Sequence, residues 1–305
     1  MGWPFLGAST HLNVVNMSLD SSPTKFSIAV DDGDIAITGF GSPAAVPDIV
    51  FLHANGFNGQ CYAEVLAPLG AGHWVLAIDL RGHGRTTLPT SMEGHRWQIF
   101  ADDLLPALQK LGGMPRVLAG HSMGATSCLL ACAGLTEAQL PQKLVLFDPV
   151  IAPPAFYNPD APPDHEFPLA RLTAARRMEF PDREAAFAQY RGRGAFRSWP
   201  DQVLRDYLSD GLLPNAQGGV SLACAPAWEA LNFASAARSD PYPALVRPEI
   251  ARKTQIFKAA ENSTFNPKLD ALAPGVTVTL TEGSSHFLPM EHPEVVRCGL
   301  ELNCP

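Results

Sequence analysis

The stretch "VLAGHSMGAT", residues 117–126, constrains the fold more than any other part of the sequence. A short apolar run leads directly into Ser122, which lies between Gly120 and Gly124 in a G-x-S-x-G pattern, and small residues typical of a packed helix follow. We expect a strand that turns sharply into a helix, because the two glycines remove the side chains that would collide in such a turn. Ser122 would then project at the carboxyl edge of a sheet, where open α/β folds bind their ligands.

The rest of the chain repeats this order of strand and helix. Residues 26–30 and 35–39 predict a β-hairpin, and later apolar runs predict buried strands at 48–53, 73–80, 116–120, 143–150, 254–260 and 276–281. Apolar residues at helical spacing predict helices at 60–68, 97–112, 121–134 and 293–301. The alternation indicates an α/β fold, in which an eight-stranded, mostly parallel sheet lies between two layers of helices.

The alternation stops after Pro149 and resumes at about residue 251. The stretch "APPAFYNPDAPPDHEFP" is too rich in proline for the interior of a sheet, and Arg-rich amphipathic helical patterns follow it. We therefore predict three parts: an N-terminal extension over residues 1–24, a core made of residues 25–150 and 251–305, and a helical cap over residues 151–250.

Composition excludes several classes of partner. The 305 residues are 46% hydrophobic and 17% charged, as in globular proteins, and the net charge of -8 argues against nucleic acid and anionic membrane surfaces. The sequence has neither an apolar run of membrane-spanning length nor a signal-peptide pattern, so we expect a cytoplasmic protein. The six irregularly spaced cysteines predict buried thiols in a reducing compartment. A homodimer is compatible with this composition.

Ser122 becomes a nucleophile only if a base removes its proton. His286 follows the last predicted strand and would lie on the same sheet edge, whereas His292 beside Pro293 is expected to be exposed at a helix start. A carboxylate must orient the base. Asp148 and Glu261 each follow a predicted strand, and we favour Asp148 while Glu261 stays open as the alternative acid.

An acyl-transfer serine also needs N–H donors for the oxyanion. The Met123 N–H is one candidate, because it comes directly after Ser122 at a helix start. The second is expected from the loop "HANGFNG" at residues 53–59; we assign it to Asn55, with Ala54 and Gly56 as alternatives. The sequence contains neither a nucleotide-binding glycine motif nor a metal-binding HExxH or paired Cys-x-x-Cys, so we expect neither a cofactor nor a metal.

Taken together, the motifs "HANGF", "DLRGHG", "GHSMGA" and "SSHFLPMEHPE" resemble the α/β-hydrolase fold superfamily over about residues 25–150 and 250–303. The resemblance implies that Ser122 is the nucleophile, His286 the base and residues 151–250 a cap inserted after the sixth strand. Many capped members carry an aspartate after the seventh strand, where this chain has Ser263; other members place the acid after the sixth strand, where Asp148 stands. A serine nucleophile argues against epoxide hydrolases and haloalkane dehalogenases.

These observations predict a serine hydrolase that cleaves a carboxylic ester or lactone of a mid-sized apolar or aromatic small molecule through an acyl-enzyme. The expected substrate-binding side chains are Phe57, His121, Phe196, Trp199, Trp228 and Phe287. The alternatives on the same scaffold are a C–C bond hydrolase, a cofactor-free oxygenase and a binding protein that does not turn its ligand over.

Overall fold

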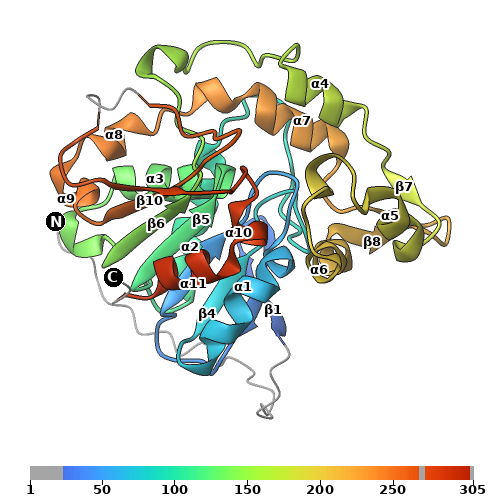
Figure 1. Cartoon of the computed structure of the whole chain (residues 1–305), viewed down its shortest axis with the longest axis horizontal. Coiled ribbons are helices and arrows are strands. Elements are labelled where there is room, and N and C mark those ends of the chain that lie inside the picture. The colour runs from blue at the N-terminus through green and yellow to red at the C-terminus, as the bar shows by residue number, and fades with distance from the viewer. Residues whose placement is uncertain (1–22, 268–271, 303–305) are drawn as a thin grey trace.

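The computed structural model describes residues 23–267 and 272–302 (Figure 1). Eight strands form one sheet in the order β1-β2-β4-β3-β5-β6-β10-β11. They are β1 (Thr24–Val30), β2 (Gly33–Phe40), β3 (Ile49–Leu52), β4 (Val75–Ile78), β5 (Val117–His121), β6 (Lys143–Phe147), β10 (Thr254–Ala259) and β11 (Thr277–Thr281). β1 pairs with β2 and β2 with β4 in antiparallel register, whereas the other neighbours are parallel. The predicted α/β fold with an eight-stranded, mostly parallel sheet is confirmed.

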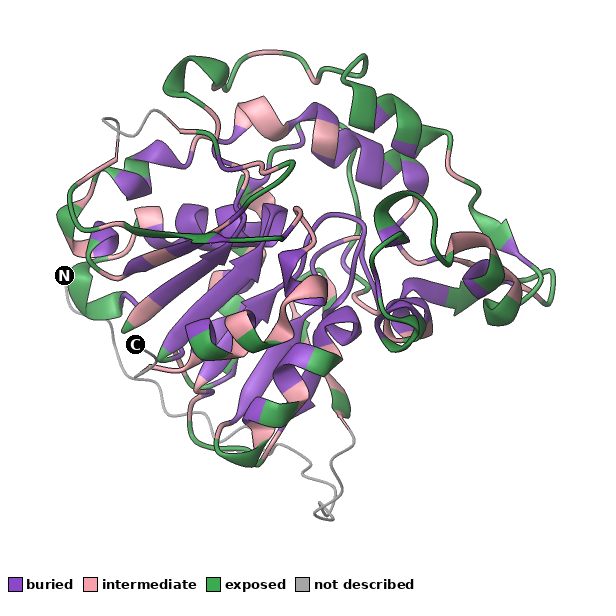
Figure 2. Cartoon of the chain, viewed as in Figure 1, coloured by how far each residue is buried: buried purple, intermediate pink, exposed green. Residues whose placement is uncertain are grey.

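Both faces of the sheet are covered, and alternate strand residues point to opposite faces. Val50 and Leu52 of β3 belong to one hydrophobic cluster, and Ile49 and Phe51 of the same strand belong to the other. The central strands are therefore buried along their whole length, as Figure 2 shows, and this explains why each reads as a continuous apolar run. The edge strand β11 is mostly exposed.

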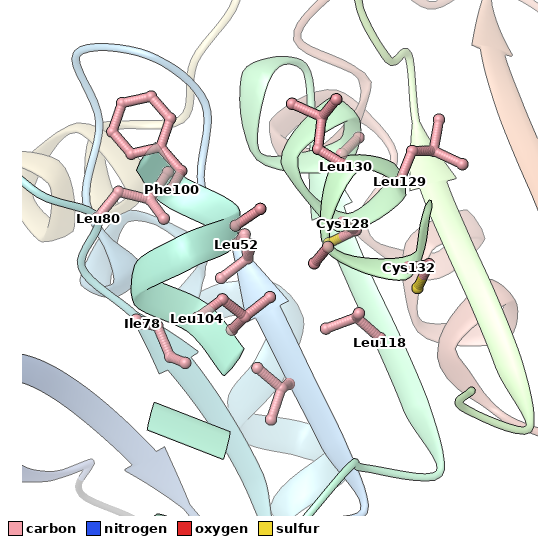
Figure 3. Packing of buried hydrophobic residues seen from close by; sticks show 14 of the residues in the cluster. Leu52, Ile78, Leu80, Phe100, Leu104, Leu118, Cys128, Leu129, Leu130 and Cys132 are labelled. Carbon is pink, nitrogen blue, oxygen red and sulfur yellow. The ribbon is translucent and has the colours of Figure 1, made fainter. Parts of the chain in front are cut away.

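Helices α2 (Gln98–Lys110) and α3 (Met123–Ala133) cover the first face, and α1 (Ala63–Leu66) and α11 (Pro293–Leu300) cover the second. Figure 3 shows Leu104 of α2 and Cys128 of α3 pointing toward the strands that carry Leu52 and Leu118. The helical stretch predicted at 60–68 is confirmed, although it consists of a 3₁₀ turn, then α1, then a second 3₁₀ turn that holds Pro68 at its start. A short helix α10 (Leu288–Glu291) precedes α11.

The segment between β6 and β10 is more varied than a purely helical cap. Its helices are α4 (Pro168–Ala174), α5 (Arg183–Tyr190), α6 (Asp201–Gly211), α7 (Pro226–Ala234), α8 (Tyr242–Leu245) and α9 (Pro248–Ala251). It also contains a three-stranded sheet in the order β7-β9-β8, made of β7 (Glu179–Phe180), β8 (Leu212–Pro214) and β9 (Val220–Leu222). The sequence did not predict these strands, because two or three residues are too few to show an alternating pattern. In Figure 1, α4 and α7 arch over the sheet, while α5, α6 and this small sheet project to one side.

The short 3₁₀ helices complete the described secondary structure: Gly59–Tyr62, Ala67–Ala71, Glu137–Gln139, Pro154–Phe156, Gly194–Phe196 and Ala236–Arg238. Within the described part of the chain, none of the helices combines the length and the apolar character needed to cross a membrane. Most of the predicted N-terminal extension lies outside the described residues.

The cysteines only partly match the expectation of buried thiols. Cys61, Cys128, Cys132 and Cys224 are free and buried. Cys298 departs from the expectation because it is disulfide-bonded. Cys304 lies outside the described residues.

Two glycines allow α3 to begin against the sheet. A Cβ atom on Gly120 would lie 2.6 Å from the carbonyl carbon of Gly124. A Cβ atom on Gly124 would lie 2.4 Å from the carbonyl oxygen of Leu52, at the end of β3. The first turn of α3 is therefore in contact with the backbone of two strands, and this contact sets the position of the residue between the glycines.

Gly124→Ala is expected to lower the free energy of unfolding by about 2 kcal/mol, because the added methyl group would push α3 away from β3. Gly134→Ala is the matched control, since a Cβ atom added there, at the other end of α3, would have no neighbouring atom within 4 Å. The control should stay within about 0.5 kcal/mol of the wild type. Urea unfolding measures both, and equal stability of the two variants would contradict the close approach.

Candidate active site

Ser122 occupies a strained turn between β5 and α3. Its φ of 54° and ψ of -120° are unusual for a residue with a side chain. The backbone is held there because the Ser122 N–H donates to the Phe147 carbonyl at 3.0 Å and α3 begins at the next residue. The hydroxyl leaves the sheet at its carboxyl edge, as the G-x-S-x-G pattern predicts.

The side chains of Ser122, His286 and Asp148 form one hydrogen-bonded chain. His286 Nε2 lies 3.0 Å from Ser122 Oγ, and His286 Nδ1 lies 2.6 Å from Asp148 Oδ2. An ionised carboxylate only accepts hydrogen bonds, so Nδ1 carries the proton of the imidazole. Nε2 of the neutral ring is then an acceptor for the Ser122 hydroxyl, the arrangement in which an imidazole removes a serine proton.

Asp148 comes directly after β6, is fully buried and has a φ of 40°. Its carboxylate also accepts from the Ala259 N–H at 3.0 Å, the Thr264 N–H at 2.9 Å and the Ser263 hydroxyl at 2.5 Å. Burial raises the pKa of Asp148, but the hydrogen bonds from His286 and Ser263 outweigh this and hold the pKa below its usual value. The buried acid is therefore kept ionised.

Glu261, the alternative acid, is exposed. Its backbone N–H donates to the Ser284 carbonyl at 2.9 Å, at the turn that leads to His286. The structure thus brings Asp148, and not Glu261, to the imidazole. The Ser263 hydroxyl donates to Asp148 and so supports this carboxylate.

The three candidate donors in the loop after β3 differ in whether their backbone N–H has an acceptor. The Ala54 N–H donates to the Tyr62 hydroxyl at 3.1 Å, and the Gly56 N–H donates to His83 Nε2 at 3.0 Å. Among residues 23–267 and 272–302, no acceptor is found for the Asn55 N–H between them. Of the three candidates from the sequence, Asn55 is therefore the one whose N–H is available. The Met123 N–H is available for a similar reason, because the first residue of a helix has no acceptor within that helix.

The peptide plane that carries the Asn55 N–H is held from its opposite side. The Ala54 carbonyl accepts from His53 Nδ1 at 2.8 Å and from the Phe57 N–H at 3.1 Å. His53 Nε2 accepts from the Leu80 N–H at 2.9 Å, so its proton is on Nδ1. This role of His53 was not predicted from the sequence, although its place at the start of the glycine-rich loop was a usable signal.

The Asn55 side chain ties the same loop to α7. Its Nδ2 donates to the Glu229 carbonyl at 2.9 Å, and its Oδ1 accepts from Asn232 Nδ2 at 2.9 Å. His95 Nε2 in turn donates to Asn232 Oδ1 at 2.7 Å. Helix α7 is thus joined to the loop by buried hydrogen bonds, which the sequence could not reveal because 177 residues separate Asn55 from Asn232.

Four of the six predicted substrate-binding residues meet in one aromatic cluster. The ring centroid of Phe57 lies 5.1 Å from Trp199 and 6.3 Å from Phe287, and Phe196 lies 4.9 Å from Trp199. Tyr207, which was not predicted, joins them at 5.8 Å from Phe57. Phe57 lies within the loop after β3, and Phe287 directly follows His286. The aromatic cluster therefore begins beside the hydrogen-bonded side chains of Ser122, His286 and Asp148.

Of the other two predicted residues, His121 lies at the edge of this aromatic cluster, with its ring centroid 6.4 Å from that of Phe57, whereas Trp228 packs elsewhere. His121 is completely buried, and both of its ring nitrogens are used within the protein. Trp228 packs 4.5 Å from His95 and donates its indole N–H to the Arg81 carbonyl at 3.1 Å. The polar atoms of both side chains thus already have partners within the protein: His121 joins Tyr62 to His286, and Trp228 joins α7 to the turn after β4. Contact of these two residues with a substrate stays a prediction.

Comparison with known proteins places the chain in a hydrolase family. The profile of the alpha/beta hydrolase family matches residues 49–297, and the chain belongs to that family. A 2-(acetamidomethylene)succinate hydrolase of Mesorhizobium japonicum is 25% identical over 285 residues, which are 92% of this chain and 96% of the relative. A bifunctional esterase/perhydrolase of Acinetobacter calcoaceticus is 32% identical over 123 residues, but these cover only 40% of this chain and 43% of the relative.

A solved structure of E-2-(acetamidomethylene)succinate hydrolase has the same fold. The TM-score is 0.68 at 21% sequence identity, and the match covers 90% of this chain and 96% of that one. Among the described residues, no cluster of three or more His, Cys, Asp or Glu side chains has an arrangement that could hold a metal ion.

Four histidines around the site are buried and neutral. Burial lowers the pKa of His83 and of His95 to about 4, lowers that of His121 to about 3, and lowers that of His53 well below its usual value. The hydrogen bonds of three of these rings match the neutral form, in which one nitrogen donates and the other accepts: His53, His83 and His121.

These histidines predict acid sensitivity. Below about pH 6.5 the unfolded chain binds protons that the folded chain does not, so the free energy of unfolding should fall by about 1.4 kcal/mol per pH unit for each histidine until pH reaches its folded pKa. Asp79 has the opposite effect on the free energy of unfolding. Burial raises its pKa to about 6, so below pH 6 the folded chain binds a proton there that the unfolded chain does not. Urea unfolding between pH 7 and 4.5 measures the slope. His95→Gln keeps an N–H for Asn232 and should reduce the slope by about 1.4 kcal/mol per unit; an unchanged slope would contradict the assignment.

Proposed function

We propose that this member of the alpha/beta hydrolase family is a serine hydrolase that cleaves a carboxylic ester or lactone through an acyl-enzyme. The observation that carries the proposal is the chain Ser122–His286–Asp148, with 3.0 Å between Oγ and Nε2 and 2.6 Å between Nδ1 and Oδ2. A hydroxyl, a base and an orienting carboxylate in this order are the requirements for an activated serine.

In the acylation step, the Ser122 hydroxyl transfers its proton to His286 Nε2 while Oγ attacks the carbonyl carbon of the ester. The carbonyl oxygen becomes an oxyanion and accepts hydrogen bonds from the N–H groups of Asn55 and Met123. Asp148 accepts the Nδ1–H and stabilises the imidazolium. The imidazolium then gives its Nε2 proton to the alkoxide oxygen, the C–O bond breaks, and the alcohol leaves.

Deacylation uses the same groups with water as the nucleophile. His286 Nε2 takes a proton from water as the water oxygen attacks the acyl carbon, and the same two N–H groups stabilise the new oxyanion. When this intermediate collapses, the bond to Ser122 Oγ breaks and Oγ recovers a proton from His286. The carboxylic acid is released and the serine is ready for another cycle.

The aromatic cluster suggests what surrounds the ester group. Its rings give an apolar surface beside His286, which suits a mid-sized apolar or aromatic acyl or alcohol group. The buried indole N–H of Trp199 finds no acceptor within the described residues, so it can donate to a substrate oxygen. The similarity to the bifunctional esterase/perhydrolase of Acinetobacter calcoaceticus supports an ester substrate.

A second candidate comes from the Mesorhizobium relative, whose substrate by name is an acetamido derivative of a dicarboxylate. A dicarboxylate would need cationic side chains near the cluster. Arg176 is such a residue, because it donates to the Tyr207 hydroxyl at 3.2 Å, but it also forms a partly buried ion pair with Glu229. Its charge is already compensated, and for this reason we favour the ester. Turnover of 2-(acetamidomethylene)succinate in preference to aryl esters would favour the second candidate.

A fluorophosphonate probe tests the activated serine. The wild type should be labelled at Ser122, located by mass spectrometry, and should hydrolyse 4-nitrophenyl acetate; Ser122→Ala should lose both. The reason is that the probe reacts with a serine only when a base removes its proton. A folded wild type that resists labelling would contradict an acyl-enzyme and would favour the oxygenase or the binding protein on this scaffold.

The choice of acid is tested by two charge-removing substitutions. Asp148→Asn should lower kcat by about 10³- to 10⁴-fold, because the amide cannot hold His286 in the tautomer with its proton on Nδ1. Glu261→Gln is the matched control and should leave kcat within about twofold of the wild type, as is usual for an exposed position. Steady-state hydrolysis of 4-nitrophenyl acetate gives both values. The reverse order of effects would transfer the acid role to Glu261.

A further inference from the structure

A buried hydrogen-bonded bridge joins the loop after β3 to the backbone of His286. The Ala54 N–H lies 3.1 Å from the Tyr62 hydroxyl, which lies 2.8 Å from His121 Nδ1. His121 Nε2 lies 2.8 Å from the carbonyl oxygen of His286. Ala54, Tyr62 and His121 are at most 4% exposed, so water does not compete for these contacts.

The His286 carbonyl at one end of the bridge fixes the direction of every hydrogen bond in it. The His286 carbonyl can only accept, so Nε2 of His121 carries a proton. Burial lowers the pKa of His121 to about 3, so the ring is neutral at pH 7 and its Nδ1 is an acceptor. The Tyr62 hydroxyl therefore donates to Nδ1, and its oxygen accepts the Ala54 N–H. Each donor in the bridge meets one acceptor, and no alternative tautomer satisfies both ends.

The bridge also rests on the sheet. Tyr62 ends the first 3₁₀ turn after β3, and its ring centroid lies 4.6 Å from that of Phe51 in β3. His121 is the last residue of β5 and directly precedes Ser122. Its ring lies 5.0 Å from the ring of His286. Tyr62 and His121 are thus bonded to the three segments that carry the oxyanion donor, the nucleophile and the base of the proposed reaction.

We propose that Tyr62 and His121 are positioning residues, which hold the loop of Asn55 at a fixed place relative to His286. This inference rests on the proposed function. The two residues act on the reaction through the backbone: Tyr62 fixes Ala54, whose neighbour Asn55 supplies an oxyanion donor, and His121 fixes the peptide of the base. Loss of the bridge should affect the transition state, where the alignment of these groups matters, more than the binding of the substrate.

Tyr62→Phe removes one hydroxyl and keeps the ring. With 4-nitrophenyl acetate we expect kcat to fall about tenfold to a hundredfold, less than for complete loss of an oxyanion donor, while KM changes by less than about threefold. The rate of labelling of Ser122 by a fluorophosphonate should fall in parallel. Tyr157→Phe is the matched control: its hydroxyl also accepts a backbone N–H, that of Ala152 at 3.0 Å, but lies outside the bridge. It should lose stability without losing kcat.

His121→Asn tests the other half. The shorter side chain can still accept from Tyr62 but does not reach the His286 carbonyl, so kcat should again fall with little change in KM. Because either substitution breaks the same bridge, the Tyr62→Phe/His121→Asn double variant should be about as slow as the slower single variant. Where Tyr62→Phe does not fold, His121→Asn carries the comparison with Tyr157→Phe by itself.

The outcomes separate the two proposals. A wild type that is not labelled at Ser122 would overturn the proposed function, and this result does not depend on the bridge. A labelled wild type, with Tyr62→Phe or His121→Asn as active as Tyr157→Phe, would overturn the positioning role and leave the hydrolase intact. Single effects that multiply in the double variant would show that Tyr62 and His121 act independently and would also overturn the bridge.

Discussion

The close approach between the first turn of α3 and the ends of β3 and β5 is the constraint on which the rest of the site depends. Only glycine fits at positions 120 and 124, because a Cβ atom at either would meet backbone atoms at less than 3.0 Å. This contact forces Ser122 into its positive φ and directs the hydroxyl away from the sheet. The same contact places the first turn of α3 beside the start of the loop after β3, so the proposed nucleophile and the proposed oxyanion donor are positioned together.

A buried carboxylate completes the arrangement, and its charge explains the structure around it. Asp148 is fully buried, and an isolated charge in that position would be strongly unfavourable. Donors from β10 and the loop after it surround the carboxylate, together with His286. Asp148 can stay ionised after β6 because the segment after β10 supplies hydrogen-bond donors, Ser263 and Thr264, to its carboxylate.

Neutral histidines provide the other polar contacts beneath the site. Three of these rings use one nitrogen as donor and the other as acceptor: His53, His83 and His121. Each ring therefore joins two segments of the chain, one through each nitrogen. A buried polar network of this kind is rigid when every member has a partner. The loop of Asn55 is held by hydrogen bonds to these histidines and, through the Asn55 side chain, to α7. The proposed oxyanion donor is thus placed by packing and does not depend on the substrate.

The sequence by itself determined the strands of the sheet, the turn at Ser122 and the candidate His286, because local patterns encode them: apolar runs, glycine spacing and a residue's place after a strand. Tertiary structure distinguished Asp148 from Glu261. Both residues follow strands, and the sequence does not show which side chain points toward His286. Tertiary structure also gave the polar atoms of His121 and Trp228 partners within the protein and revealed Tyr62. Those roles depend on contacts between residues up to 165 positions apart, and the spacing of residues along a chain does not encode which distant groups will meet.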